Sequence, residues 1–146
     1  MWERLTNHLK VMLEGIDEIA SVYDYEEGEF NEQPVAVIVP SDSEGEFTTS
    51  LDNEEIYAFN VFLFVQIGDT FYTKKEADEV LRELVDTVKR EFDKNWALSG
   101  LSTETGYSML FMETAPSAWG YSSRENIYRM AELTLRVHLS IDTNLI

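Results

Sequence analysis

The segment "EEIYAFNVFLFVQIG", residues 54–68, is the most apolar in the chain and decides the fold. With the period of two that belongs to a β-strand, its side chains divide into two sets that point to opposite faces. One set is Tyr57, Phe59, Val61, Leu63, Val65 and Ile67, and the other is Ile56, Ala58, Asn60, Phe62, Phe64 and Gln66. Both sets are largely apolar, so we expect a long strand covered by a helix on one face and by a partner on the other.

Apolar spacing on either side of this strand predicts the remaining elements. Helical spacing runs from Leu5 to Ile16 and again from Ala77 to Phe92, the second run following Thr73 and Glu76 at capping-box spacing. The run "PVAVIVP" and the alternating segment "RMAELTLRVHLSI" are typical of strands. A weaker alternation at residues 19–26 suggests one further short strand. The main elements expected are helices over about 2–17 and 73–94 and strands over about 35–40, 55–67, 107–115 and 128–141, with a break near Pro116.

These elements fit one domain spanning residues 1–146. Its length and its 44% hydrophobic content are sufficient for one packed core. The order of helix, strands, helix, strands predicts an α+β fold, with a mostly antiparallel sheet and the helices packed on one of its faces.

The charge is strongly negative and unevenly distributed. The net charge is −17, and residues 1–55 hold 15 acidic and 2 basic side chains whereas residues 56–146 hold 13 and 9. Such a balance opposes binding to nucleic acid, because phosphates must be neutralised by Lys and Arg, and it disfavours an anionic membrane surface for the same reason. No secretory signal or membrane span is expected, and the chain is interpreted as soluble and made in a cytoplasm.

The residue types that carry common enzyme chemistry are sparse or badly spaced. Cysteine is absent, and His8 and His138 are the only two histidines, so neither a thiolate nor a His-based zinc site is expected. No calcium-loop register fits the acidic segment, and no GxSxG elbow, P-loop or dinucleotide fingerprint occurs. The many carboxylates lie mostly in predicted turns and on solvent faces of helices, which disfavours a glycosidase. We therefore expect no catalytic residues, no metal and no cofactor.

The order of these segments resembles the tail terminator proteins of long-tailed bacteriophages, also called tail completion or tail-to-head joining proteins. The resemblance covers nearly the whole chain: an opening helix, "SVYDYEEGEFNEQPVAVIVP" at 21–40, "YAFNVFLFVQI" at 57–67, one amphipathic helix and "RMAELTLRVHLSI" at 129–141. It implies a structural virion protein at the head–tail junction, assembled in the host cytoplasm. Its subunits would form a ring, a hexamer in the family, that caps the tail tube, ends its polymerisation and meets the head connector. DNA would pass through the ring without specific binding.

The segment "SDSEGEFTTSLDNEE", Ser41 to Glu55, is predicted to be the acidic loop of a β-hairpin. It holds six carboxylates and no base. We expect Phe47 to be an apolar anchor against a neighbouring subunit or the tube, with Glu44 and Glu46 setting the charge around it; a merely solvated turn is the alternative. On the polar face of the last strand, Arg136 and His138 are the other candidate contact residues.

Two other functions fit the same sequence. One is an acidic cytosolic domain that binds a protein partner and whose charge serves solubility, and the other is a different phage neck or minor tail protein. A DNA-mimic inhibitor is disfavoured, because it needs carboxylates spaced like phosphates on a rigid surface, whereas the acids here cluster in predicted turns.

Overall fold

A computed structural model describes residues 1–146 except 28, 31, 49–53, 95–106, 124 and 142–146, with the backbone alone described for 42–48, 54, 107–111 and 141. Two helices and five strands follow one another along the chain. They are α1 (Trp2–Glu14), β1 (Ser21–Tyr23), β2 (Val35–Thr48), β3 (Glu54–Ile67), α2 (Lys74–Lys94), β4 (Tyr107–Ser123) and β5 (Ile127–Ile141).

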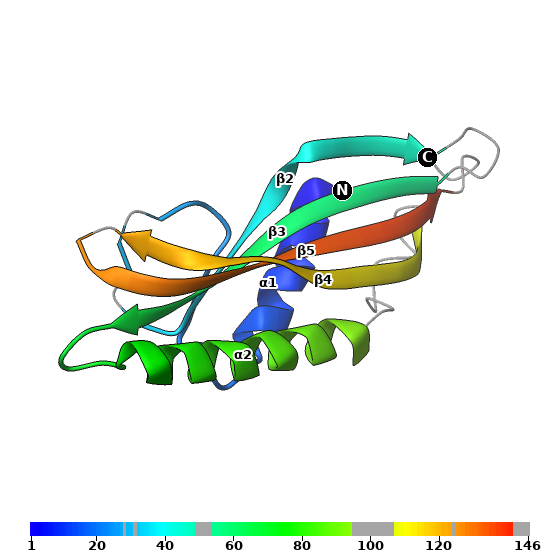
Figure 1. Cartoon of the computed structure of the whole chain (residues 1–146). Coiled ribbons are helices and arrows are strands. Elements are labelled where there is room, and N and C mark those ends of the chain that lie inside the picture. Colours follow the sequence, from blue (N-terminus) through cyan, green and yellow to red (C-terminus); the bar gives the residue numbers. More distant parts are fainter. Residues whose placement is uncertain (28, 31, 49–53, 95–106, 124, 142–146) are drawn as a thin grey trace.

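The strands form one sheet in the order β1-β2-β3-β5-β4 (Figure 1). Only the short β1 runs parallel to its neighbour, and the other pairs are antiparallel. The two hairpins, β2–β3 and β4–β5, join through β3 and β5 in a continuous register from Glu54 opposite Ser140 to Ile67 opposite Ile127. The predicted α+β fold with a mostly antiparallel sheet is therefore confirmed, and the segment at 54–68 forms a strand at its centre.

Both helices pack on the same side of the sheet, called here the helix face. Leu5, Leu9 and Leu13 of α1 and the apolar stripe of α2 share one core with the first side-chain set of β3. Figure 1 shows α2 running beneath the sheet, with α1 at an angle to it near β2 and β3. From β5 the alternating Leu133, Leu135, Val137 and Leu139 complete this core, and all four are fully buried. Helix α1 ends three residues before the expected boundary of 17, with Gly15 bonding back to the carbonyls of Val11 and Met12.

Helix α2 begins with the predicted capping box. The Thr73 backbone N–H donates to Glu76 Oε1 at 3.1 Å, and the Glu76 N–H donates to Thr73 Oγ1 at 3.2 Å. Two backbone donors that no helical carbonyl can reach are thereby satisfied. The cap fixes the start of the helix one residue after Thr73.

Two strands extend beyond the prolines that were expected to end or break them. Strand β2 continues through Pro40 to Thr48, so residues 45–48 of the predicted loop at 41–55 are paired with β3, and β4 continues through Pro116 to Ser123. Register shifts follow both prolines, between Pro40 and Gly45 and between Pro116 and Ala118. Pro40 lies past the end of the β1–β2 pairing and pairs only with β3, and Pro116 lies in the edge strand β4 and pairs only with β5. A missing backbone N–H is tolerated at such an edge or bulge, which explains why the expectation was wrong.

Replacing Thr73 by Ala should destabilise the domain by about 1 kcal/mol, because one early N–H of α2 loses its side-chain acceptor. Thr87→Ala, in the middle of the same helix, is the matched control: its hydroxyl bonds to the Glu83 carbonyl, which the helix already engages. Urea denaturation followed by circular dichroism measures both. Equal free energies of unfolding for the two variants would show that the cap contributes nothing.

Candidate functional site

The described residues of the segment 24–33, which leave out 28 and 31, are called here the strap, and they cross the face of the sheet opposite the helices, which is the outer face (Figure 1). The strap connects β1 to the parallel β2 and is tied to distant parts of the chain. Near one end, Gln33 Oε1 accepts a hydrogen bond from the backbone of Gln66 in β3 at 3.2 Å. In its middle, Glu29 Oε1 accepts one from the backbone N–H of Glu125, in the β4–β5 turn, at 2.9 Å. The strap therefore reaches across the sheet from one edge to the far hairpin.

Phe30 fixes the strap to the sheet. Its ring lies 5.0 Å from that of Phe64 and 5.4 Å from that of Tyr128, between centroids, and only 8% of the residue is exposed. Val35 and Val37 join this second, smaller core. The apolar outer side of β3 is thus covered in part by the chain itself, where a partner was expected to cover it.

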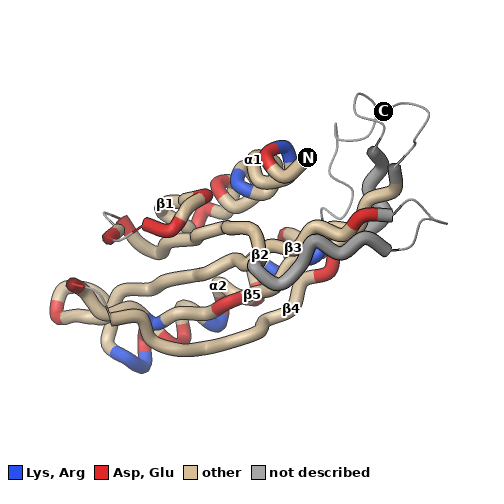
Figure 2. Tube along the Cα trace, turned by 90° about the horizontal axis from the view of Figure 1, so that it is seen from above, with Lys and Arg blue, Asp and Glu red and all other residues tan. Residues whose placement is uncertain are grey.

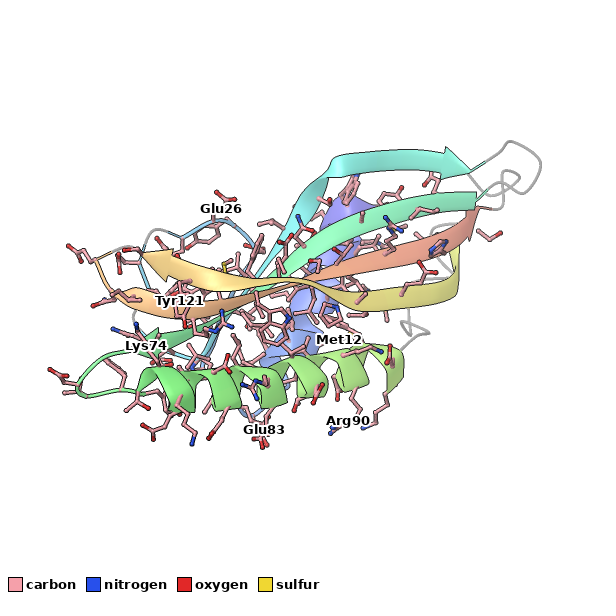
Figure 3. The ribbon with its side chains drawn as sticks, viewed as in Figure 1. Met12, Glu26, Lys74, Glu83, Arg90 and Tyr121 are labelled. Carbon is pink, nitrogen blue, oxygen red and sulfur yellow. The ribbon has the colours of Figure 1, made fainter. Side chains whose placement is uncertain are left out.

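A small cavity, called here the strap cavity, lies between the strap and the outer face. Its volume is about 180 Å³. The sheet contributes an apolar floor and Ser122 from the end of β4, while the strap contributes two carboxylates. The lining residues are Glu26, Glu27, Val37, Phe62, Phe64, Ser122 and Met130. Figure 3 shows Glu26 on the side of the sheet away from α2.

The Glu27 carboxylate is oriented by a neighbouring phenol. Tyr25 donates a hydrogen bond from its hydroxyl to Glu27 Oε2 at 3.2 Å. This bond to the carboxylate raises the pKa of Tyr25 above its ordinary value, because losing the proton would place two negative charges side by side. Glu27 is therefore held beside the cavity as a hydrogen-bond acceptor.

The predicted contact residues on the last strand lie on the outer face, next to an acid of the same chain. Arg136 is exposed and stands opposite Glu113 of β4 in the register. His138 is 8% exposed, and its Nε2 lies 3.4 Å from Glu113 Oε2. Glu113 and Arg136 border a shallow groove shared with Ala115 and Thr134. The structure thus brings Arg136 and His138 together around Glu113.

The other predicted contact residues belong to the far part of β2. Glu44, Glu46 and Phe47 lie within the strand, where Glu46 pairs with Ile56 and Phe47 with Glu55. Their side chains lie outside the described residues, so the expected contact of Phe47 stays a prediction. The backbone pairing places this segment in a paired hairpin, not in the long open loop that was expected.

Sequence reasoning missed a cluster around Arg129 on the helix face. The Arg129 Nε lies 3.0 Å from Asp78 Oδ1 of α2, and Nη1 donates to the Gly120 carbonyl at 2.7 Å. Its guanidinium carbon also lies 4.8 Å from the centre of the Tyr121 ring. Tyr121, 57% exposed, points from β4 toward the start of α2 (Figure 3). The signal in the sequence was a base, Arg129, at a position of β5 whose alternation otherwise calls for an apolar residue.

Basic residues are unevenly distributed along the chain. No Lys or Arg occurs between Val11 and Thr73, whereas α2 alone carries six, interspersed with seven acids. Figure 2 shows acidic positions around β1 and the strap, and both acidic and basic positions on α2. Across the described residues, His, Asp and Glu side chains nowhere gather in groups of three that could hold a metal ion. Neither described helix combines the length and apolarity needed to cross a membrane.

No protein-family model matches the chain, and no curated protein matches it at a significant level. The chain's own geometry is therefore the basis for inferring its function.

Phe30→Ala should lower the free energy of unfolding by about 3 kcal/mol, the lower end of the range for a buried Phe, because the strap can partly collapse onto the space left. It should also speed hydrogen exchange of the Glu125 amide, which bonds to the strap. Phe71→Ala, at an exposed Phe before α2, is the control for the same change of residue type. Equal losses in both variants would mean that Phe30 does not anchor the strap.

Asp78→Asn should lower the urea midpoint at neutral pH, and the difference from the unmodified protein should shrink in acid. Hydrogen bonds from Arg82 and then Arg129 hold the pKa of Asp78 below its ordinary value of 3.8. The stability that Asp78 contributes is therefore complete above that ordinary value and is lost as the pH falls through the lower pKa of the folded state. Asp86→Asn, exposed on the same helix, controls for the loss of one charge. A difference that stayed constant below about pH 4 would contradict the ion pair's role.

Proposed function

We propose that this protein is a structural virion component that caps a phage tail tube as a ring, ends tube polymerisation and joins tail to head. The observation that carries the proposal is the asymmetry of the sheet. One edge is formed by β1 and the part of β2 beyond it, and the other by β4 with the exposed Trp119 and Tyr121. A closed ring of identical subunits requires two different patches on each subunit that meet head to tail. Two dissimilar sheet edges supply such a pair.

The charge distribution supports the same role. The acidic first part of the chain would suit a lumen or rim that DNA must pass, because carboxylates repel phosphates and any Lys or Arg contact would hold the genome. The stretch from Asp17 to Gln33, which includes β1 and the strap, contains seven acids and no base. A surface of this kind conducts DNA without binding it.

The proposed partners follow from this role. Copies of the chain form the ring, a hexamer as the resemblance implies, one rim meets the tail-tube protein, and the other meets the head connector. The location is the virion, at the head–tail junction. The role is structural and not enzymatic, and it needs no cofactor.

An acidic protein-binding module is the second candidate, and the strap cavity favours it. Its apolar floor and two carboxylates form a small binding site that a ring component does not require. A different phage neck or minor tail protein would also be compatible with the asymmetric sheet edges and the strap cavity.

Ring formation is tested by light scattering at several protein concentrations and by negative-stain imaging, with and without tail-tube subunits of the same virus. Rings are expected, at least in the presence of the tube. Phe47→Ala should reduce the fraction of subunits in rings if Phe47 anchors the β2–β3 hairpin on its neighbour. Phe71→Ala serves as the control at an exposed Phe elsewhere.

Absence of rings both alone and with tube subunits would contradict the terminator role. Rings that form equally well with Phe47→Ala would remove Phe47 from the interface while leaving the role intact. Hydrogen exchange at Tyr57 and Ile56, which pair with the Phe47 segment, would show whether the hairpin itself survives the substitution.

A further inference from the structure

We propose that the strap cavity binds an arginine or lysine side chain presented by a basic segment of another protein. The inference does not depend on ring assembly, because it concerns the outer face of a single subunit. If the proposed function holds, a tail-tube or connector subunit would carry the basic segment.

The size of the cavity selects a single side chain. Its volume of about 180 Å³ is well below the roughly 300–1,000 Å³ typical of sites for drug-sized ligands, and well above the roughly 30 Å³ that one water occupies. The floor is formed by Val37, Phe62, Phe64 and Met130 from three neighbouring strands. An apolar stem several methylene groups long would therefore find contacts along its length.

The chemistry of the opening selects a cation at the end of that stem. Among the described residues of the cavity lining, Glu26 and Glu27 from the strap are the charged groups, and both are acidic. The Phe62 ring is only partly buried beside them, so it can present a face to a cation. Arg and Lys are the two side chains that join a long apolar stem to a charged head.

The charge of the chain argues that the side chain comes from a different protein. A second copy carries a net charge of −17, so its approach to the acidic strap in particular is opposed by repulsion. Several described bases already have acidic partners within the subunit: Lys10 with Asp24, Arg82 and Arg129 with Asp78, and Lys89 with Asp93. A basic segment of another protein is not repelled in this way, because the acidic side of the subunit attracts it.

The strap that forms the opening is held in place before any ligand arrives. Glu29 is bonded to the far hairpin, Phe30 is buried against Phe64, and Tyr25 holds Glu27. The site is therefore already ordered before a side chain enters it, and the low entropic cost of binding favours even a small group.

The test is an NMR titration of the folded domain with N-acetyl-arginine amide, and with N-acetyl-citrulline amide as its neutral counterpart of the same shape. The arginine compound should shift the Met130 methyl and Phe62 amide signals in a saturable way, and the citrulline compound should not. In Glu26→Gln/Glu27→Gln the affinity should fall about tenfold, as expected when charge-assisted contacts are replaced by neutral ones. Phe62→Leu, which keeps an apolar floor but removes the ring, should weaken binding by a smaller factor.

Glu18→Gln/Glu83→Gln is the matched control, because those two acids line a separate cavity beside α2 and their replacement changes the net charge equally. If the affinity for the arginine compound fell equally in this control, the binding would reflect only attraction to the protein's net negative charge, and the proposal would be overturned. So would equal shifts with the citrulline compound, or no shift at Met130 with either. Concentration-dependent shifts of the same signals without any probe, lost in Glu26→Gln/Glu27→Gln, would identify a second copy as the occupant and overturn the assignment to another protein.

Discussion

Burial of β3 on both faces is the constraint on which the rest of the structure depends. A strand with bulky apolar groups on its two sides cannot be stable at an edge or on a half-covered sheet, since each large side chain gains about 1.5–3 kcal/mol only when it leaves water. On one side, α1 and α2 supply the cover, and Phe59, Val61 and Leu63 lie in their shared core. On the other side, the strap supplies Phe30, which covers Phe64. The central place of β3 in the sheet and the course of the strap both follow from this requirement.

The sequence predicts those elements whose signal is local. The alternation of β5, the two helices and the capping box at Thr73 depend on spacing alone, and spacing survives folding unchanged. The course of β2 and β4 beyond Pro40 and Pro116 depends instead on where each strand lies in the sheet. A proline interrupts a central strand but not an edge, and edge position is decided by partners distant in the sequence.

The same limit applies to the candidate sites. Arg136 and His138 were placed on the polar face of β5 by alternation, but their neighbour Glu113 comes from another strand and is visible only in the register. The strap cavity was invisible for a similar reason. An acidic stretch with one Phe is typical of a solvated turn, and nothing in it predicts that Phe30 reaches Tyr128, 98 residues further along. Long-range pairing, not composition, turns this stretch into part of a site.

The strap also sets an order in time. Glu26 and Glu27 leave the ribosome early, whereas Ser122 and Met130 on the opposite side of the same cavity leave it about a hundred residues later. Since synthesis proceeds from the N-terminus, a nascent chain cannot form the complete cavity until the second hairpin has been made and has paired with the first. The hydrogen bond from the Glu125 N–H to Glu29 therefore forms only in a chain whose sheet is complete, and only such a chain can present this surface to a partner.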